Sequence, residues 1–179
     1  ASAYDQAGNW IYKLATGRYT QVHQPRIYAS TDNVSSIDPE QSTHIMIDAE
    51  YDTPGLLLYG GAYYKDYDQL ALNSGSTFTS GGSGYAYGAD FRFRHKGSKL
   101  FGKKSLYSLT VSLLRARKNY LRFERRIAPV NEVPFSFYVF SKHSLTSSLM
   151  IGLTHFQSAG RPYSASAALA QDQRLPWMH

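Results

Sequence analysis

Hydrophobic and polar residues alternate along several stretches of the chain, and the clearest of these is 84–94, GYAYGADFRFR. Its odd-numbered positions are mostly aromatic, and its even-numbered positions are small or charged. Successive side chains of a β-strand point to opposite faces, whereas a helix would scatter these residues around its circumference. The pattern therefore predicts a strand with one apolar face and one polar face.

The same alternation recurs along the chain, and each recurrence predicts a further strand. The segments are 43–51, 105–113 and 149–155, with weaker versions at 10–20, 56–66 and 135–142. Aromatic and β-branched residues, which favour pleated surfaces, recur in these segments. The sequence therefore predicts an all-β chain of about seven strands.

Short and long connections alternate between these strands. The short ones are 52–55 (DTPG, a tight turn), 95–99 and 144–147, and the long ones are 21–42, 69–83, 116–134 and the residues from 161 onward. Proline presets one turn position and glycine accepts positive φ at the next, which explains the first turn. The alternation predicts an antiparallel up-and-down arrangement with turns at one end and loops at the other, as in outer-membrane barrels.

Composition narrows the chemistry without selecting a function. The chain has 179 residues, 15 of them tyrosine, no cysteine and a net charge of +6. The lack of cysteine excludes a disulfide framework and a thiolate metal site, and the histidines have no ligand spacing, so no metal site is predicted. The positive charge fits nucleic acid, acidic lipid head groups or an anionic ligand. The aromatic residues Trp10, Tyr59, Tyr63, Tyr64, Tyr67, Tyr85, Tyr87 and Tyr107 are predicted to form interfacial girdles.

Five stretches, read in order, resemble the barrel of TonB-dependent outer-membrane receptors. They are 38–43 (DPEQST) followed by Glu50-Tyr51, 62–67 (AYYKDY), 84–93, 158–163 (SAGRPY) and 174–179 (RLPWMH). The resemblance covers roughly residues 13–179. Two departures are Ala159, an insertion within the fourth stretch, and Asp48-Ala49 ahead of Glu50.

The resemblance implies one barrel segment over 1–179, part of a larger barrel without its plug or terminal strands. It implies energised import of a scarce ligand, such as a metal chelate or an oligosaccharide, with no catalysis and no cofactor. The implied location is the outer membrane. The implied partners are membrane lipid and lipopolysaccharide, the remainder of the barrel and plug, the TonB complex indirectly, and a small ligand, with no nucleic acid.

Two groups of residues are candidates for function. Charged residues on the polar faces are expected to face the lumen or plug, namely Asp48, Glu50, Asp90, Arg92 and Arg94. Loop residues are expected to contact the ligand, namely Arg26, Tyr28, Phe78, Arg117, Tyr120 and Arg122.

Other hypotheses stay open at this stage. Asp48 and Glu50 also fit a carboxylate pair for acid–base catalysis. The basic and aromatic run at 115–126 also fits nucleic-acid binding. Ser108, Ser112 and His155 would be the hydrolytic set of a small outer-membrane barrel enzyme, and the tyrosines would stack on sugar in a soluble all-β carbohydrate-binding domain.

Overall fold

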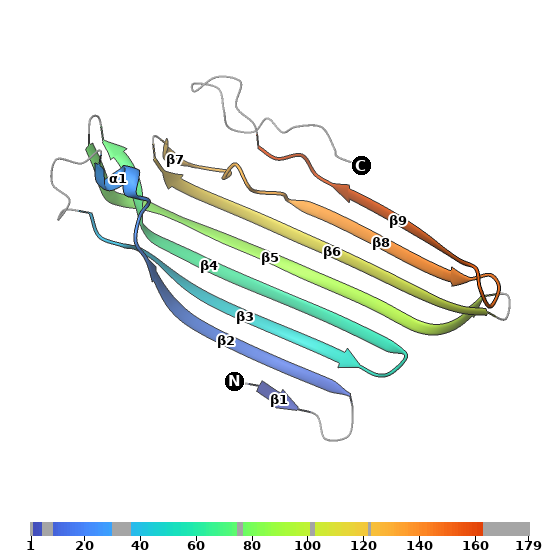
Figure 1. Cartoon of the computed structure of the whole chain (residues 1–179). Coiled ribbons are helices and arrows are strands. Elements are labelled where there is room, and N and C mark those ends of the chain that lie inside the picture. The colour runs from blue at the N-terminus through green and yellow to red at the C-terminus, as the bar shows by residue number, and fades with distance from the viewer. Residues whose placement is uncertain are drawn as a thin grey trace.

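The computed structural model describes residues 2–4, 9–29, 37–74, 77–100, 103–121 and 123–162. The strands form one nine-stranded antiparallel sheet whose path runs β1-β2-β3-β4-β5-β6-β8-β9, with β7 paired to β6 beside this path (Figure 1). The strands are β1 Ser2–Tyr4, β2 Trp10–Gln21, β3 Glu40–Asp52, β4 Leu56–Ser74, β5 Thr77–Leu100, β6 Lys103–Tyr120, β7 Phe123–Ile127, β8 Phe135–Ser144 and β9 Met150–Ser158. A short helix, α1, spans Pro25–Ala29.

The sheet is a single curved layer in which neighbouring strands are also neighbours along the chain, except that β8 pairs with β6 and β7 comes between them in sequence (Figure 1). This confirms the predicted all-β, antiparallel, up-and-down architecture. Among the described residues the sheet does not close on itself, so the barrel stays a prediction. The predicted single segment 1–179 also stays a prediction, and its residues 163–179 lie outside the described part.

The strands meet short turns at one end of the sheet, here called the turn end. Residues 53–55 connect β3 to β4, and the Thr53 amide donates to the Leu56 carbonyl at 2.8 Å. Residues 145–149 connect β8 to β9, where the Leu145 amide donates to the Leu149 carbonyl at 2.9 Å. Both turns lie where the sequence predicted them. The helix α1, the tip of the β4–β5 hairpin and β7 lie at the opposite end, here called the loop end (Figure 1).

Two predicted connections are wrong, because the strands continue through them. The segment 95–99 lies within β5, where an irregularity between Lys96 and Ser98 accommodates Gly97 at φ +87°. The predicted loop 69–83 is instead the distal part of the β4–β5 hairpin. Gln69 adopts φ +58° at a register shift, so a bulge lets the two strands keep pairing past a polar, glycine-rich sequence.

The predicted loop 116–134 is also partly strand. β6 continues to Tyr120, and β7 pairs with it beyond the point where β8 ends. The strands β1 and β7 were not predicted. Each spans only a few residues, too few for alternation to be recognised.

The buried apolar cluster of this single-layer sheet lies at the loop end. Ile27 of α1, Ile37 and Ala71 of β4 form it, each less than one-tenth exposed, and Tyr28, Phe78 and Leu121 pack against it. This loop-end cluster joins the connection between β2 and β3 to the projecting hairpin of β4 and β5. His23 supports it, since its Nε2 lies 3.0 Å from the Asp38 carbonyl oxygen.

Candidate functional site

The strand register places all five predicted lumen-facing residues on one face of the sheet, here called the polar face. Directly paired residues of neighbouring antiparallel strands lie on the same side. One row of partners contains Lys13, Asp48, Gly61, Asp90, Ser112 and Ser136. The next two rows toward the turn end contain Glu50, Tyr59, Arg92 and Thr110, and then Asp52, Leu57, Arg94 and Ser108. Alternation alone predicted this sharing of a face, while the register brings the residues side by side.

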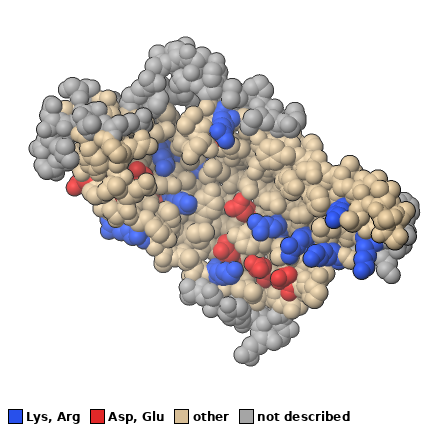
Figure 2. All heavy atoms as spheres, in the orientation of Figure 1, with Lys and Arg blue, Asp and Glu red and all other residues tan. Residues whose placement is uncertain are grey.

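Acidic and basic side chains intermingle on the polar face toward the turn end (Figure 2). Lys13 Nζ lies 3.6 Å from Glu50 Oε2, and the Tyr59 hydroxyl donates to Asp48 Oδ1 at 3.0 Å. The guanidinium of Arg92 lies 5.8 Å from the centroid of the Tyr59 ring. Glu50, Tyr59, Asp90 and Arg92 line a hollow of about 500 Å³ on this face. The hollow is therefore bordered by mutually compensating charges.

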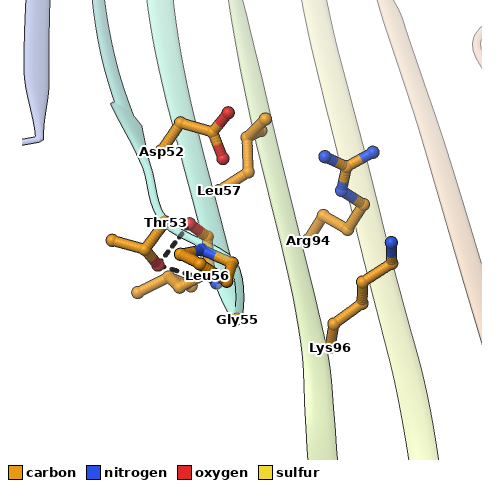
Figure 3. Close-up of a pocket in the computed structure, with 8 residues that line it drawn as sticks. Asp52, Thr53, Gly55, Leu56, Leu57, Arg94 and Lys96 are labelled. Carbon is orange, nitrogen blue, oxygen red and sulfur yellow. Dashed lines mark hydrogen bonds between the residues drawn. The ribbon is translucent and has the colours of Figure 1, made fainter.

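A second hollow, of about 360 Å³, lies beside the β3–β4 turn. Figure 3 shows Leu57 between Asp52 and Arg94, with Lys96 one row further toward the turn end. The Thr53 hydroxyl both accepts from the Leu56 amide and donates to its carbonyl, at 3.0 Å each. These bonds fix the conformation of the turn next to the charged side chains of Asp52, Arg94 and Lys96, which line the hollow.

The opposite face, here called the apolar face, is aliphatic and aromatic across the width of the sheet. A central row contains Tyr12, Ala49, Gly60, Phe91, Val111 and Phe137. The side chains of Leu14, Ile47 and Leu153 on this face are 51%, 61% and 65% exposed. A soluble monomer rarely leaves a continuous apolar surface of this extent uncovered, so the apolar face is itself a candidate interface.

The aromatic residues predicted to form girdles are divided between the two faces of the sheet, and the girdles themselves stay a prediction. Trp10, Tyr64, Tyr85, Tyr87 and Tyr107 lie on the apolar face. Tyr59, Tyr63 and Tyr67 lie on the polar face, away from the other five. These three occupy the other parity of β4, because adjacent tyrosines at 63 and 64 must point to opposite sides.

Among the predicted ligand-contacting residues, Tyr28, Phe78, Arg117 and Tyr120 lie near the loop end but take different roles. Tyr28 and Phe78 both pack against the loop-end cluster, so the structure brings them together. Phe78 lies on β5 and Tyr120 on β6, although the sequence predicted loops for both residues. Burial raises the pKa of Tyr120. The side chain of Arg26 and the whole of Arg122 lie outside the described residues.

Arg117 has a structural partner that the sequence did not indicate. Its Nη1 lies 3.1 Å from Oε2 of Glu132, whose side chain is 1% exposed. The same carboxylate accepts from the Ala116 amide at 3.4 Å. Glu132 therefore lies against the edge of β6 between the residues that pair with β7 and those that pair with β8. Among the described residues, no strand pairs with this part of β6. The sequence gives little indication of this role, because a single glutamate within a polar stretch is expected to be exposed at the surface.

The sequence also missed a cluster of cations and tyrosines on the polar face near the loop end. Lys118 Nζ lies 3.3 Å from the centroid of the Tyr67 ring, and Lys65 Nζ lies 5.3 Å from that of Tyr63. Burial lowers the pKa of Lys118, and the charge of Lys65 adds to this, while Glu40 acts in the opposite direction. Burial likewise raises the pKa of Tyr67. The spacing of Lys65 and Lys118 in the sequence gives no sign of their proximity.

The residues of the hydrolytic hypothesis do not come together. Ser108 and Ser112 lie on the polar face, whereas His155 pairs with Val139 on the apolar face. A hydroxyl and an imidazole on opposite sides of a sheet cannot exchange a proton directly.

No protein-family model, curated protein or solved structure matches the chain. Its class therefore follows from its own residues, as an antiparallel up-and-down sheet with one apolar and one polar face. Among the described residues, no helix has the length and apolar character required to cross a membrane.

Proposed function

We propose that the chain forms part of the transmembrane β-barrel of an outer-membrane receptor of the TonB-dependent kind. In this proposal, the apolar face contacts lipid and the polar face lines a water-filled lumen or contacts a plug. Its role is the uptake of a scarce ligand, such as a metal chelate or an oligosaccharide. The ligand would enter from the loop end.

The observation that carries the proposal is the exposed apolar face of a single-layer sheet. Ile47 and Leu153 are more than half exposed although they belong to a nearly continuous apolar surface. Nothing among the described residues covers this face. Hydrocarbon would remove it from water, because the inner strands satisfy their backbone hydrogen bonds with one another and the remainder of the barrel would pair with the two edges.

The aromatic residues of the apolar face mark the borders expected of such a layer. Trp10 and Tyr51 pack together near the turn end, with ring centroids 5.1 Å apart. Tyr85 and Tyr87 stack near the loop end, with centroids 6.1 Å apart. The stretch from Tyr85 to Phe93 has the length, about nine to eleven residues, that a tilted strand needs to cross a bilayer.

The apolar stretch also shifts along the strands from one side of the sheet to the other. On β5 it reaches Tyr85 toward the loop end, and on β6 it stops at Leu113, which is followed by Arg115 on the same face. On β9 it stops at Leu153, and the next residue on this face is His155. Rows of paired residues run perpendicular to the strands. When the strands are tilted in a membrane, the lipid layer cuts across these rows at an angle, so the apolar stretch moves along each successive strand. The shift therefore fits barrel strands.

Two further observations support the receptor assignment. The stretches 62–67 and 84–93, which resemble those of TonB-dependent receptors, fall within the paired strands β4 and β5. The predicted plug-facing residues share the polar face, where Lys13 pairs with Glu50 and Tyr59 donates to Asp48. A lumen wall that meets water or a charged plug requires such a surface.

The proposal is tested by transferring the chain from denaturant into buffer, into detergent and into lipid vesicles. We expect circular dichroism to show sheet only with detergent or lipid. A Trp177→Phe variant leaves Trp10 as the sole tryptophan, and brominated lipid should quench its fluorescence. A monomer that is soluble and folded in plain buffer, with Trp10 unaffected by brominated lipid, would refute the membrane assignment and favour a soluble all-β binding domain.

A further inference from the structure

The polar face holds a small recess near the loop end that is distinct from the charged hollows at the turn end. Its volume is about 200 Å³, and it is lined on one side by Tyr63, Lys65 and Tyr67 of β4. Lys118 of β6 and Asn131 line the other side. A space of this size holds about six water molecules, or one carboxylate or phosphate group with part of its hydration.

The floor of the recess brings the two lysines within reach of the same small group. Lys65 pairs with Ala86 on β5, and Ala86 pairs with Ala116 on β6. Lys118 stands one row further toward the loop end, opposite Gly84. Because alanine and glycine leave the middle of this surface low, long side chains from β4 and β6 can reach across it from both sides.

The charges around the recess favour an anion. Lys65, Lys118 and Glu132 line the recess. Two further carboxylates act on the lining residues, Glu40 on Lys118 and Tyr67 and Asp90 on Tyr63. Glu132 is engaged by Arg117, with 3.1 Å between Nη1 and Oε2, and by the Ala116 amide. Asp90 lies with Arg92 along the turn-end hollow. Glu40 is therefore the carboxylate that acts on Lys118 itself.

Lys118 is partly desolvated before any ligand arrives. Its ammonium lies 3.3 Å from the centroid of the Tyr67 ring, which screens it from water on that side. Burial lowers the pKa of Lys118, Glu40 acts in the opposite direction, and the charge of Lys65 lowers it further. An oxyanion between the lysines would relieve their repulsion and would accept charge-assisted hydrogen bonds from both.

We propose that this recess binds an anionic oxygen group, a carboxylate or a phosphate, and that the protein selects anionic ligands over neutral ones. The inference rests on the proposed function, because the polar face lines an uptake path only if the sheet is part of a barrel. It deepens that function by naming the class of ligand. Tyr63 and Tyr67 offer ring faces and hydroxyl groups to the portion of the ligand next to the anionic group.

The test uses the full chain folded in detergent, with citrate, inorganic phosphate and neutral maltotriose as probes. Binding is followed by calorimetry and by NMR of ¹³C-methylated lysines. We expect citrate or phosphate to bind saturably and to shift two lysine signals, which are assigned by their loss in the Lys65→Gln and Lys118→Gln variants. Each of these variants should weaken binding by about tenfold or more. The difference between citrate and phosphate identifies which oxyanion the recess prefers.

Lys142→Gln is the matched control, since Lys142 also lies on the polar face but toward the turn end of β8. It should leave binding unchanged, and Lys65→Arg and Lys118→Arg should retain most of it. The inference is overturned if maltotriose binds as well as citrate, if neither anion binds, or if Lys142→Gln weakens binding as much as the recess variants. If the chain inserts into vesicles but binds neither anion, this inference fails and the proposed function stands. Anion binding by a chain that stays out of lipid defeats the proposed function instead.

Discussion

Tyr63 on β4 lies directly opposite Gly88 on β5, and the two residues share the space above the polar face. A Cβ atom at position 88 would stand 2.5 Å from the Tyr63 hydroxyl oxygen and 2.5 Å from the Leu113 carbonyl oxygen. The tyrosine side chain thus reaches across the glycine, an arrangement that shields the exposed backbone of a glycine in a sheet. It also holds Tyr63 at the border of the recess next to Lys65.

Replacing Gly88 should therefore disturb the sheet. We expect Gly88→Ala to lower the free energy of unfolding by about 1–3 kcal/mol, because the backbone of β6 as well as the tyrosine must move. Urea unfolding in detergent micelles would measure the change. Gly60→Ala is the control, since a Cβ at position 60 would meet nothing within 4 Å. Equal effects of the two substitutions would argue against the contact between Tyr63 and position 88.

Val111 and Thr110 are consecutive residues of β6 that lie on opposite faces at nearly the same depth. We expect Val111→Arg to reduce the stability of the lipid-inserted state by about 2–4 kcal/mol, because the proposed function places this side chain against hydrocarbon. Phe91 pairs with Val111, so Phe91→Arg should reduce the stability by a similar amount. Thr110→Arg should cost far less, since it adds a charge to the polar face. Urea titration of vesicle-bound protein measures all three, and a cost at Thr110 equal to that at Val111 contradicts the assignment of the faces.

Glu132 completes the edge of β6 at the loop end. Glu132→Ala leaves Arg117 without its carboxylate and the Ala116 amide without its acceptor. We expect a loss of about 2–3 kcal/mol in local stability, seen as faster hydrogen exchange at Ala116. Glu50→Ala removes the exposed pair with Lys13, whose side chains are 26% and 45% exposed, and should cost under about 1 kcal/mol. Unchanged exchange at Ala116 would show that Glu132 has no such role.

The loop-end cluster should be separable from the sheet. Ile37 is 6% exposed and packs with Ile27 and Ala71, so Ile37→Ala should destabilise the cluster by about 2–5 kcal/mol. We expect faster proteolysis within 22–39 while the circular dichroism of the sheet stays constant. Val22→Ala, at a side chain that is 70% exposed, serves as the control and should leave proteolysis unaltered. A parallel loss of sheet signal with Ile37→Ala would mean that the cluster is needed for the whole fold.

The sequence predicted the faces of strands better than their ends. Alternation assigned Asp48, Glu50, Asp90 and Arg92 to one side because the side-chain period of a strand is fixed at two residues. It misplaced the connections at 69–83 and 95–99, since glycine and polar residues there signal turns although bulges at Gln69 and Gly97 keep the strands paired. Local composition does not show whether a neighbouring strand is present to continue the ladder.

The same limit applies to the candidate sites. The shared polar face of the charged residues followed from the sequence, but the recess between Lys65 and Lys118 did not, because it depends on register across three strands. The partner of Arg117 was also hidden, since Glu132 reaches it only after the chain has turned back along β6.

By itself the sequence determined an all-β chain whose strands have one apolar and one polar side. That property is local, because each side chain's direction depends only on its position within its own strand. The tertiary structure decided which residues become neighbours, which face of the sheet Tyr59, Tyr63 and Tyr67 join, and that the apolar side remains uncovered among the described residues. Those outcomes depend on hydrogen bonds between distant segments, and a one-residue change in register would have exchanged the two faces.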